Sequence, residues 1–128
     1  MNIIVRQVDE TDLPFIFSTW LKGLYHGNEL YGKTNQDLFY SKYHKVIEAL
    51  LKVSEVKIAC LQDEPDVVLG YSVALGNTLH WVFVKKAWRK LGISKSLVNP
   101  TITTVSHLTK VGESIAKKKD WTFNPFLF

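Results

Sequence analysis

The chain has 128 residues, of which 46% are hydrophobic and 22% charged, and it carries a formal net charge of +4. This composition is typical of a globular protein and argues against a disordered or fibrous chain. The length suffices for one hydrophobic core, so we predict a single domain over residues 1–128. No apolar run approaches the roughly 20 residues of a membrane-spanning helix, and we expect no membrane association. The polar residue Arg6 argues against a secretory signal peptide.

The first part of the chain predicts one strand and two amphipathic helices. Residues 3–8 indicate a short strand, and residues 9–12 approximate a capping box at a helix start. Apolar residues then recur at helical spacing over residues 13–24 and again over residues 39–51. Residues 26–33 between the helices are expected to form a loop, which is either a substrate loop or an ordinary connection.

Three antiparallel strands are predicted for the middle of the chain. Residues 56–60 alternate between inward and outward positions, and residues 67–75 and 78–84 form apolar runs. Gly76-Asn77, between the last two runs, is typical of a two-residue hairpin turn. These segments therefore predict a meander.

Cys60, the one cysteine, lies in the first strand of this meander. A single cysteine excludes an internal disulfide framework and is typical of a reducing compartment. We therefore expect a buried thiol and a cytoplasmic location, and we predict no metal site.

The last part of the chain predicts helix, strand, helix and strand. The helix after the meander is expected to end at Asn99-Pro100, because the residue before a proline disfavours helix. Residues 102–108 are β-branched and alternating and predict a strand. A helix is then expected from residue 109 or 110 to about residue 118, followed by a strand over the aromatic residues 121–128.

A basic segment joins the last strand of the meander to the helix that follows. Arg89, Gly92 and Ser94 occupy the pattern Gln/Arg-x-x-Gly-x-small, and the lysines nearby are Lys85, Lys86, Lys90 and Lys95. The first N–H groups of a helix have no intrahelical partner, so a glycine-containing basic turn there is suited to bind phosphate. The six-residue pattern alone fits a basic surface turn equally well.

The order of these elements, together with this pattern, resembles the GCN5-related N-acetyltransferases (GNAT). The resemblance implies an α+β fold with α/β/α layers, in which a mixed, mostly antiparallel central sheet is flanked by helices and the C-terminus is short. It implies acetyl-CoA as the cofactor. It also implies that the cofactor-binding residues are Val82 and Val84 on the strand and Arg89, Lys90, Leu91, Gly92, Ile93, Ser94 and Lys95 in the diphosphate segment.

Two family positions differ in this sequence. The strand position where the family often has a carboxylate base holds Thr78, and His80 is two residues further along. Histidine titrates near neutral pH, so His80 is the candidate base, and the alternative is a buried or substrate-contacting histidine. The tyrosine that protonates the leaving thiolate in the family is replaced by Ala116, which leaves Ser114 or water as candidates.

These residues support several functional hypotheses. The first is an N-acetyltransferase that transfers an acetyl group from acetyl-CoA directly to the amine of a small molecule or peptide in a ternary complex. The alternative is a catalytically inactive protein of this fold with a structural or protein-interaction role, which Thr78 and Ala116 favour. Nucleic-acid binding by lysines and tryptophans is disfavoured, because Trp81 and Trp121 lie in predicted strands. A homodimer or another protein partner is a further candidate at the C-terminal sheet edge.

Overall fold

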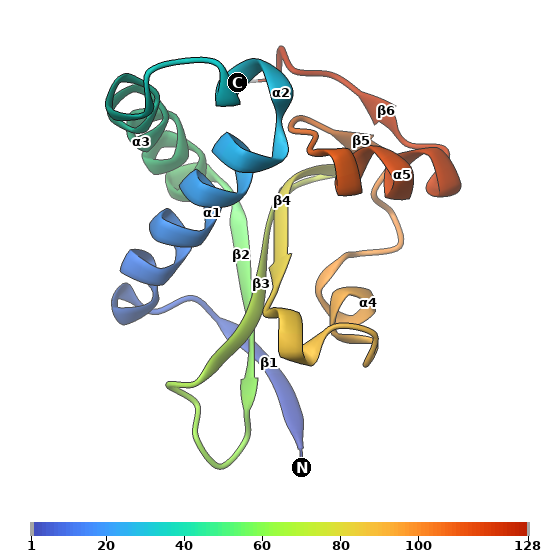
Figure 1. Ribbon diagram of the computed structural model, residues 1–128. Helices are drawn as coiled ribbons and strands as arrows, with labels where there is room; N and C mark the ends of the chain where they lie inside the picture. Colours follow the sequence, from blue (N-terminus) through green and yellow to red (C-terminus); the bar gives the residue numbers. More distant parts are fainter. Residues whose placement is uncertain (1, 128) are drawn as a thin grey trace.

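A six-stranded sheet in the order β1-β2-β3-β4-β5-β6 forms the centre of the protein, which we analysed as a computed structural model that describes residues 2–127 (Figure 1). The first four strands are antiparallel, and β5 and β6 are added parallel to β4. The strands are β1 (Ile3–Gln7), β2 (Glu55–Leu61), β3 (Val68–Leu75), β4 (Thr78–Val84), β5 (Thr104–Val105) and β6 (Thr122–Phe123).

Helices cover both faces of this sheet. In Figure 1, α1 and α3 lie on one face, and α4 and α5 lie on the other. None of the helices within residues 2–127 is long and apolar enough to cross a membrane. The α-helices are α1 (Leu13–Gly27), α2 (Glu29–Gly32), α3 (Gln36–Val53), α4 (Ile93–Leu97) and α5 (Lys110–Lys119), and the 3-10 turns are η1 (Glu10–Asp12) and η2 (Lys86–Trp88). The predicted α+β, α/β/α-layered fold is confirmed.

The larger hydrophobic core lies between the sheet and the helices α1 and α3. Trp20 of α1 stacks on Trp81 of β4, with ring centroids 5.6 Å apart and planes 9° from parallel. Ile16 and Ile47 are fully buried in the same cluster. These contacts fix one face of β4, the strand from which the candidate site is built.

Two smaller clusters lie under α4 and α5. Ile93 and Leu97 of α4 pack against Ala59 and Leu69 of β2 and β3. Beside them, α5 contributes a single buried residue, Ala116, to a cluster with Leu79, Ile102 and Val105. The second face of the sheet is therefore covered by fewer buried side chains than the first.

The strands predicted over residues 102–108 and 121–128 are much shorter in the structure. Only two residues of each segment pair with a neighbour, although Ile102 and Val105 are both buried. The side chains of Ile102 and Val105 pack in a core cluster, and the segment around them does not form a longer strand pair. The predicted strand over 121–128 also includes Phe128, which lies outside the described residues.

The loop predicted over residues 26–33 is partly helical. The helix α1 continues to Gly27, and α2 forms a further short turn whose N-terminus is capped by the Asn28 side chain. The same Asn28 amide donates a hydrogen bond to the Leu108 carbonyl at 3.0 Å. This segment therefore ties the end of α1 to the chain just before α5.

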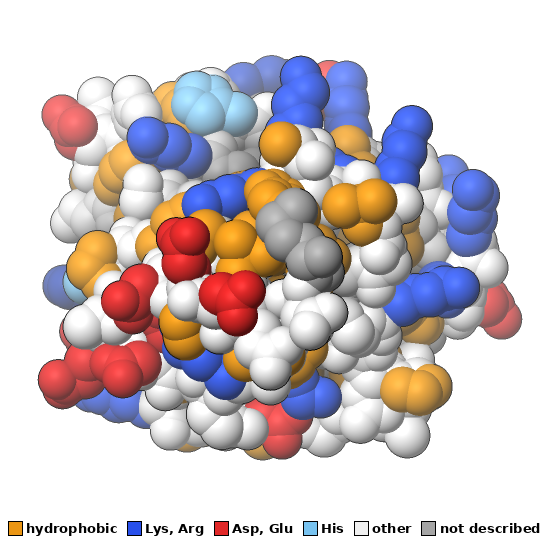
Figure 2. Space-filling model, turned by 90° about the horizontal axis from the view of Figure 1, so that it is seen from below, with side chains coloured by type: hydrophobic (Ala, Val, Ile, Leu, Met, Phe, Trp, Pro, Cys, Tyr) orange, Lys and Arg blue, Asp and Glu red, His pale blue; other side chains and the backbone are white. Residues whose placement is uncertain are grey.

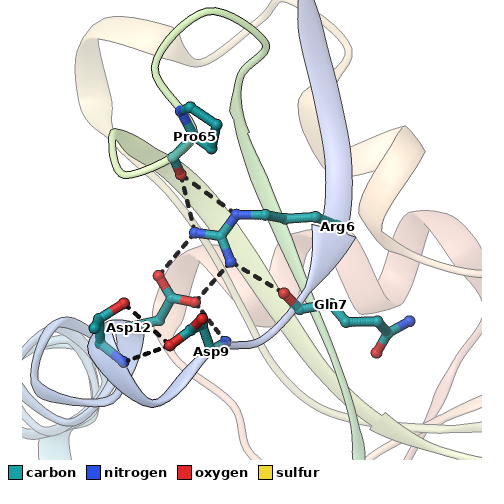
Figure 3. Close-up of polar contacts among 6 residues, drawn as sticks. Arg6, Gln7, Asp9, Asp12 and Pro65 are labelled. Carbon is teal, nitrogen blue, oxygen red and sulfur yellow. Dashed lines mark hydrogen bonds and ion pairs between the residues drawn. The ribbon is translucent and has the colours of Figure 1, made fainter.

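Arg6 joins three separate parts of the fold (Figure 3). Its guanidinium donates two hydrogen bonds to the Asp12 carboxylate, at 2.8 and 2.9 Å, and others to the carbonyl oxygens of Gln7 and Pro65. The Asp12 carboxylate also accepts the backbone N–H of Asp9, which completes the predicted capping box at η1. The hydrogen bonds from Arg6 hold the pKa of Asp12 below its usual range.

Surface charge is unevenly distributed. The turn between β2 and β3 carries Asp63, Glu64 and Asp66, all exposed. Figure 2, which views the end of the molecule with this turn, shows acidic side chains grouped on one side and lysines and arginines mainly elsewhere. The sequence has no Asp or Glu between Asp66 and Glu113, so the segment after β4 carries only basic side chains, which suits a negatively charged ligand.

We expect Arg6→Ala to lower the free energy of unfolding by about 2–3 kcal/mol, because Asp12, 3% exposed, would keep a buried charge without its partner. Lys57→Ala is the matched control. It removes the Lys57–Glu55 ion pair on the neighbouring strand, where both side chains are more exposed, and should cost at most about 1 kcal/mol. Urea unfolding at pH 7 measures both, and equal losses would contradict the structural role of Arg6.

Candidate functional site

The candidate site is a cleft that opens where β4 and β5 separate. The two strands pair only at Thr78 with Thr104 and at Leu79 with Val105, and the Ser106 N–H then donates to the Leu79 carbonyl at 3.2 Å. Beyond this point β4 continues to Val84, and among the described residues β3 alone pairs with this part of it. The resulting cleft has a volume of about 520 Å³ and extends from β4 to α5. This size is typical of small-ligand sites.

The backbone of β4 presents hydrogen-bonding groups to this cleft. The Lys85 N–H donates to the Leu69 carbonyl at 2.8 Å, so these two residues form a hydrogen-bonded pair of the β3–β4 ladder. Residues of an antiparallel ladder alternate, so Val84 and Val82 direct their N–H and C=O groups away from β3. The open edge of β4 can therefore bind an extended ligand through the main chain of these two residues.

The segment between β4 and α4 closes one end of the cleft. The Arg89 Nε donates to the Val84 carbonyl at 2.9 Å, which folds the segment back against the strand. Lys90 and Gly92 both have positive φ, at 66° and 81°. Alternation of left-handed and ordinary backbone conformations turns successive N–H groups toward one concave side, which is a common way to bind anions.

Most of the predicted site residues line this one cleft. They are His80, Val82, Val84, Arg89, Lys90, Gly92, Ile93 and Ser94. Leu91 and Lys95 were also predicted but do not line it, and the Leu91 side chain is 62% exposed. Ser114, the candidate acid on α5, is likewise exposed and outside the lining.

His80 lies at an irregular point of β4. Trp81 pairs with Val73 and Leu79 pairs with Ala74, so His80 is an extra residue, as in a β-bulge. The bulge interrupts the strand alternation that would place Thr78 and His80 on one face. The histidine lines the cleft with only 3% of its surface exposed, and this burial lowers its pKa.

A hydrogen-bonded chain connects His80 to β5. The Ser106 hydroxyl lies 2.6 Å from Nδ1 of His80 and 2.8 Å from Nδ1 of His107. Burial and the nearby His80 lower the pKa of His107 to about 4. Sequence analysis missed Ser106 and His107, although a Ser-His pair inside an otherwise β-branched segment was the available sign.

Two glycines of α1 allow the other elements of the cleft to approach this helix. A Cβ atom at Gly23 would lie 2.9 Å from the Trp81 ring, and one at Gly27 would lie 2.8 Å from the Thr109 side chain. Both glycines line the cleft, and a side chain at Gly23 would push β4 away from α1, whereas one at Gly27 would push the start of α5 away from α1.

The helix α5 forms the wall opposite β4. Thr109 caps its first turn by accepting the Gly112 N–H at 3.1 Å. Val111 and Ile115 line the cleft while 72% and 43% exposed. No tyrosine lines the cleft within the described residues, and Ala116 packs inward instead. The side chains of α5 that line the cleft, Val111 and Ile115 among them, are therefore mainly apolar.

Comparison with known proteins identifies the fold. No family model and no curated protein matches the sequence. Among solved structures, a GCN5-related N-acetyltransferase from Rhodopseudomonas palustris matches with a TM-score of 0.61 at 18% identity, over 92% of this chain and 81% of that chain. An acetyl transferase assigned in Pyrococcus furiosus matches with a TM-score of 0.61 at 15% identity, and the match covers 94% of this chain and 78% of that chain.

This chain has the GNAT fold. The resemblance predicted from the sequence is thus confirmed at the level of the fold. Apo YjaB from Escherichia coli also matches, with a TM-score of 0.51 at 14% identity over 76% of this chain. This GNAT-fold chain spans 62% of the length of YjaB.

We expect His107 to make the protein less stable in mild acid. The unfolded chain takes up this proton near the ordinary pKa of 6.5 and the folded chain only near 4, so the free energy of unfolding falls as the pH drops through this window. The full effect is about 3 kcal/mol. His107→Gln should flatten this part of the curve in urea unfolding at pH 7.5, 6, 5 and 4.

Removal of His26, an exposed histidine on α1, is the control. His80 is also buried with a lowered pKa and adds to the slope, so His107→Gln should reduce the slope rather than abolish it. If the His107→Gln curve runs parallel to that of the parent protein, burial of His107 does not govern the acid response.

Proposed function

We propose that this protein is an acetyl-CoA-dependent N-acetyltransferase. The supporting observation is that the open edge of β4, the basic segment Arg89–Ser94 and His80 all border one cleft. The first can bind an extended arm, the second a diphosphate, and the third can accept a proton. The GNAT fold supports the same assignment, but only as a similarity of fold to acetyltransferases.

The residues of the cleft fit the parts of acetyl-CoA in order along its length. The backbone groups of Val82 and Val84 would hold the amide-containing pantetheine arm, because amides both donate to and accept from a strand edge. The N–H groups of residues 90–94 would hold the diphosphate, since the Arg89 N–H donates to the Lys86 carbonyl, and the Arg89 and Lys90 side chains would add positive charge at the rim. These charges are exposed, so the backbone groups should contribute most of the affinity.

Acetyl-CoA supplies the acetyl group as a thioester. His80 would accept the proton that the amine loses as it attacks, since burial keeps the histidine neutral at neutral pH. Direct transfer is favoured over a cysteinyl intermediate, because Cys60 is fully buried in β2 and does not line the cleft. The acceptor is the amine of a small molecule or a peptide.

No phenol is available for the leaving thiolate among the described cleft residues. The hydroxyl groups that line the cleft belong to Ser94 and Thr109, and Thr109 is engaged as the cap of α5. Protonation of the thiolate by water is therefore part of the proposal. This lack of a dedicated acid is also what favours the alternative, a non-catalytic protein of the same fold.

We expect Gly92→Glu to weaken acetyl-CoA binding at least tenfold. The side chain would add a carboxylate beside the diphosphate segment and would have to adopt φ of +81°. Gly76→Glu is the matched control: this glycine also has positive φ, at +60°, and open space around it, but it lies in the β3–β4 hairpin outside the cleft. Calorimetric titration of acetyl-CoA measures both variants, with thermal unfolding as the check on folding.

If the parent and Gly76→Glu both bind acetyl-CoA and Gly92→Glu does not, the result supports the diphosphate site. If the folded parent protein shows no heat of binding with acetyl-CoA and acetyl-CoA does not raise its unfolding temperature, the acetyltransferase proposal is overturned. The protein-interaction alternative would then be tested next, by affinity capture with Arg89→Glu as the comparison.

We expect His80→Gln to lower kcat by about 10²–10⁴-fold with an amine substrate, because the general base is removed. The parent protein should lose activity only below pH 6.5, since the pKa of His80 lies below that ordinary value and the neutral form is the active one. Thiol release over a panel of amines provides the assay. His44→Gln, at an exposed position on α3, is the control, and an unchanged kcat in His80→Gln would exclude the base role.

A further inference from the structure

The cleft is lined from both faces of the sheet. Gly23 and Gly27 line it from α1, which covers one face (Figure 1). Ile93 and Ser94 line it from α4, which covers the other. The proposed diphosphate site occupies the α4 end, so the end between α1 and α5 is left for the amine that accepts the acetyl group.

Apolar groups border this α1–α5 end of the cleft. The end of α1 meets the start of α5 where Gly27 faces the Thr109 side chain, and the Trp81 ring packs beside Gly23. Val111 and Ile115 continue the lining along α5, and both side chains are exposed to solvent. An apolar ligand that covers these side chains removes them from water, which contributes favourable free energy. The α1–α5 end is therefore suited to an apolar body.

Lys110 brings positive charge to the same end of the cleft. Its ion pair with Glu29 is 3.8 Å long, and both side chains are 79% exposed, so water and salt screen most of this attraction. A second cation on a ligand would be repelled by Lys110. The same surroundings favour the neutral form of a bound amine, which is the form that attacks the thioester.

The acidic residues of this region border a different hollow. Glu113 and Asp120 line a hollow of about 360 Å³ on α5, and neither of them lines the cleft. Trp121 lines both hollows and so lies between them. Glu113 is in addition paired with Lys117 at 3.7 Å. A second ammonium group in the cleft would therefore lie against apolar surface and near Lys110, which costs free energy.

We propose that the acceptor is a small primary amine with an apolar body, and that the α1–α5 end of the cleft disfavours amines that carry a second positive charge. This inference rests on the proposed acetyl transfer and names its substrate class. The cleft volume of about 520 Å³ must also hold the pantetheine arm, which favours a small acceptor.

The transfer itself balances with such an amine. A bond forms between the amine nitrogen and the acetyl carbon, and the C–S bond of the thioester breaks with its electron pair on sulfur. The proton that the amine loses passes to His80 and then to solvent, and the thiolate takes a proton from water. The products are the N-acetylated amine and CoA.

Hexylamine and hexamethylenediamine form a matched pair of probes, because they share a six-carbon chain and differ in one terminal ammonium group. Thiol release from acetyl-CoA at pH 8 measures transfer to each. We expect the parent protein to have a kcat/KM about tenfold or more higher for hexylamine than for the diamine, counted per amino group, because the second ammonium has to leave water.

Val111→Glu should remove most of this preference, because it places a carboxylate on the α5 wall where a second ammonium group would lie. Val111 is in the first turn of α5 after the Thr109 cap and is 72% exposed, so a glutamate there is compatible with the helix and removes little core. Ser114→Glu is the matched control, since it adds the same charge to the same helix at an exposed position outside the cleft lining. Thermal unfolding checks that both variants fold.

The outcomes separate this inference from the proposed function. A preference for hexylamine that Val111→Glu loses and Ser114→Glu keeps supports the inference. Equal transfer to both amines, or a preference for the diamine, overturns it while acetyl transfer stands. A preference that Val111→Glu leaves unchanged overturns the placement of the acceptor beside α5.

If the parent protein acetylates neither amine, the proposed function is overturned, and equilibrium binding decides the inference. Each amine is then titrated calorimetrically into the protein with CoA present. Tighter binding of hexylamine than of the diamine, reduced in Val111→Glu, supports an apolar amine site without turnover. Binding of neither amine, or equal binding of both, overturns the inference as well.

Discussion

The early end of pairing between β4 and β5 is the constraint on which the rest of the site depends. A strand edge left without a neighbour exposes peptide groups that water or a ligand must satisfy. Here that edge begins after Leu79 and continues to the end of β4. The cleft, the orientation of the Val82 and Val84 peptide groups and the position of His80 at the fork all follow from this divergence.

An unpaired edge is useful only if the strand behind it is held rigidly. β4 is fixed on its other side by the β3 ladder, and the close approach at Gly70 leaves no room for a side chain, since a Cβ there would lie 2.5 Å from the Phe83 carbonyl. The stack of Trp20 on Trp81 anchors the same strand from the α1 face. The site is thus built on a strand whose position is determined from two directions.

Patterns that depend on neighbouring residues were predicted well from the sequence, and features that depend on distant contacts were not. The meander, the capping box and the segment around Gly92 follow from local periodicity and turn chemistry, and each is present. The predicted length of β5 was wrong, because β-branched residues such as Ile102 can pack in a hydrophobic core without pairing in a sheet. The bulge at His80 and the link through Ser106 arise from strand pairing, which no local pattern encodes.

The two walls of the cleft differ in how they are attached to the protein. β4 belongs to the main core, whereas α5 contributes one buried residue, Ala116, and the segment before α5 is joined to β4 by a single two-residue strand pair. Segments with few buried contacts open locally at a lower free energy than the whole molecule. A ligand that bridges the walls would therefore protect the amide hydrogens of α5 from exchange far more than those of β4. Binding of a ligand in the cleft would therefore change the stability of the C-terminal quarter of the chain more than that of the rest.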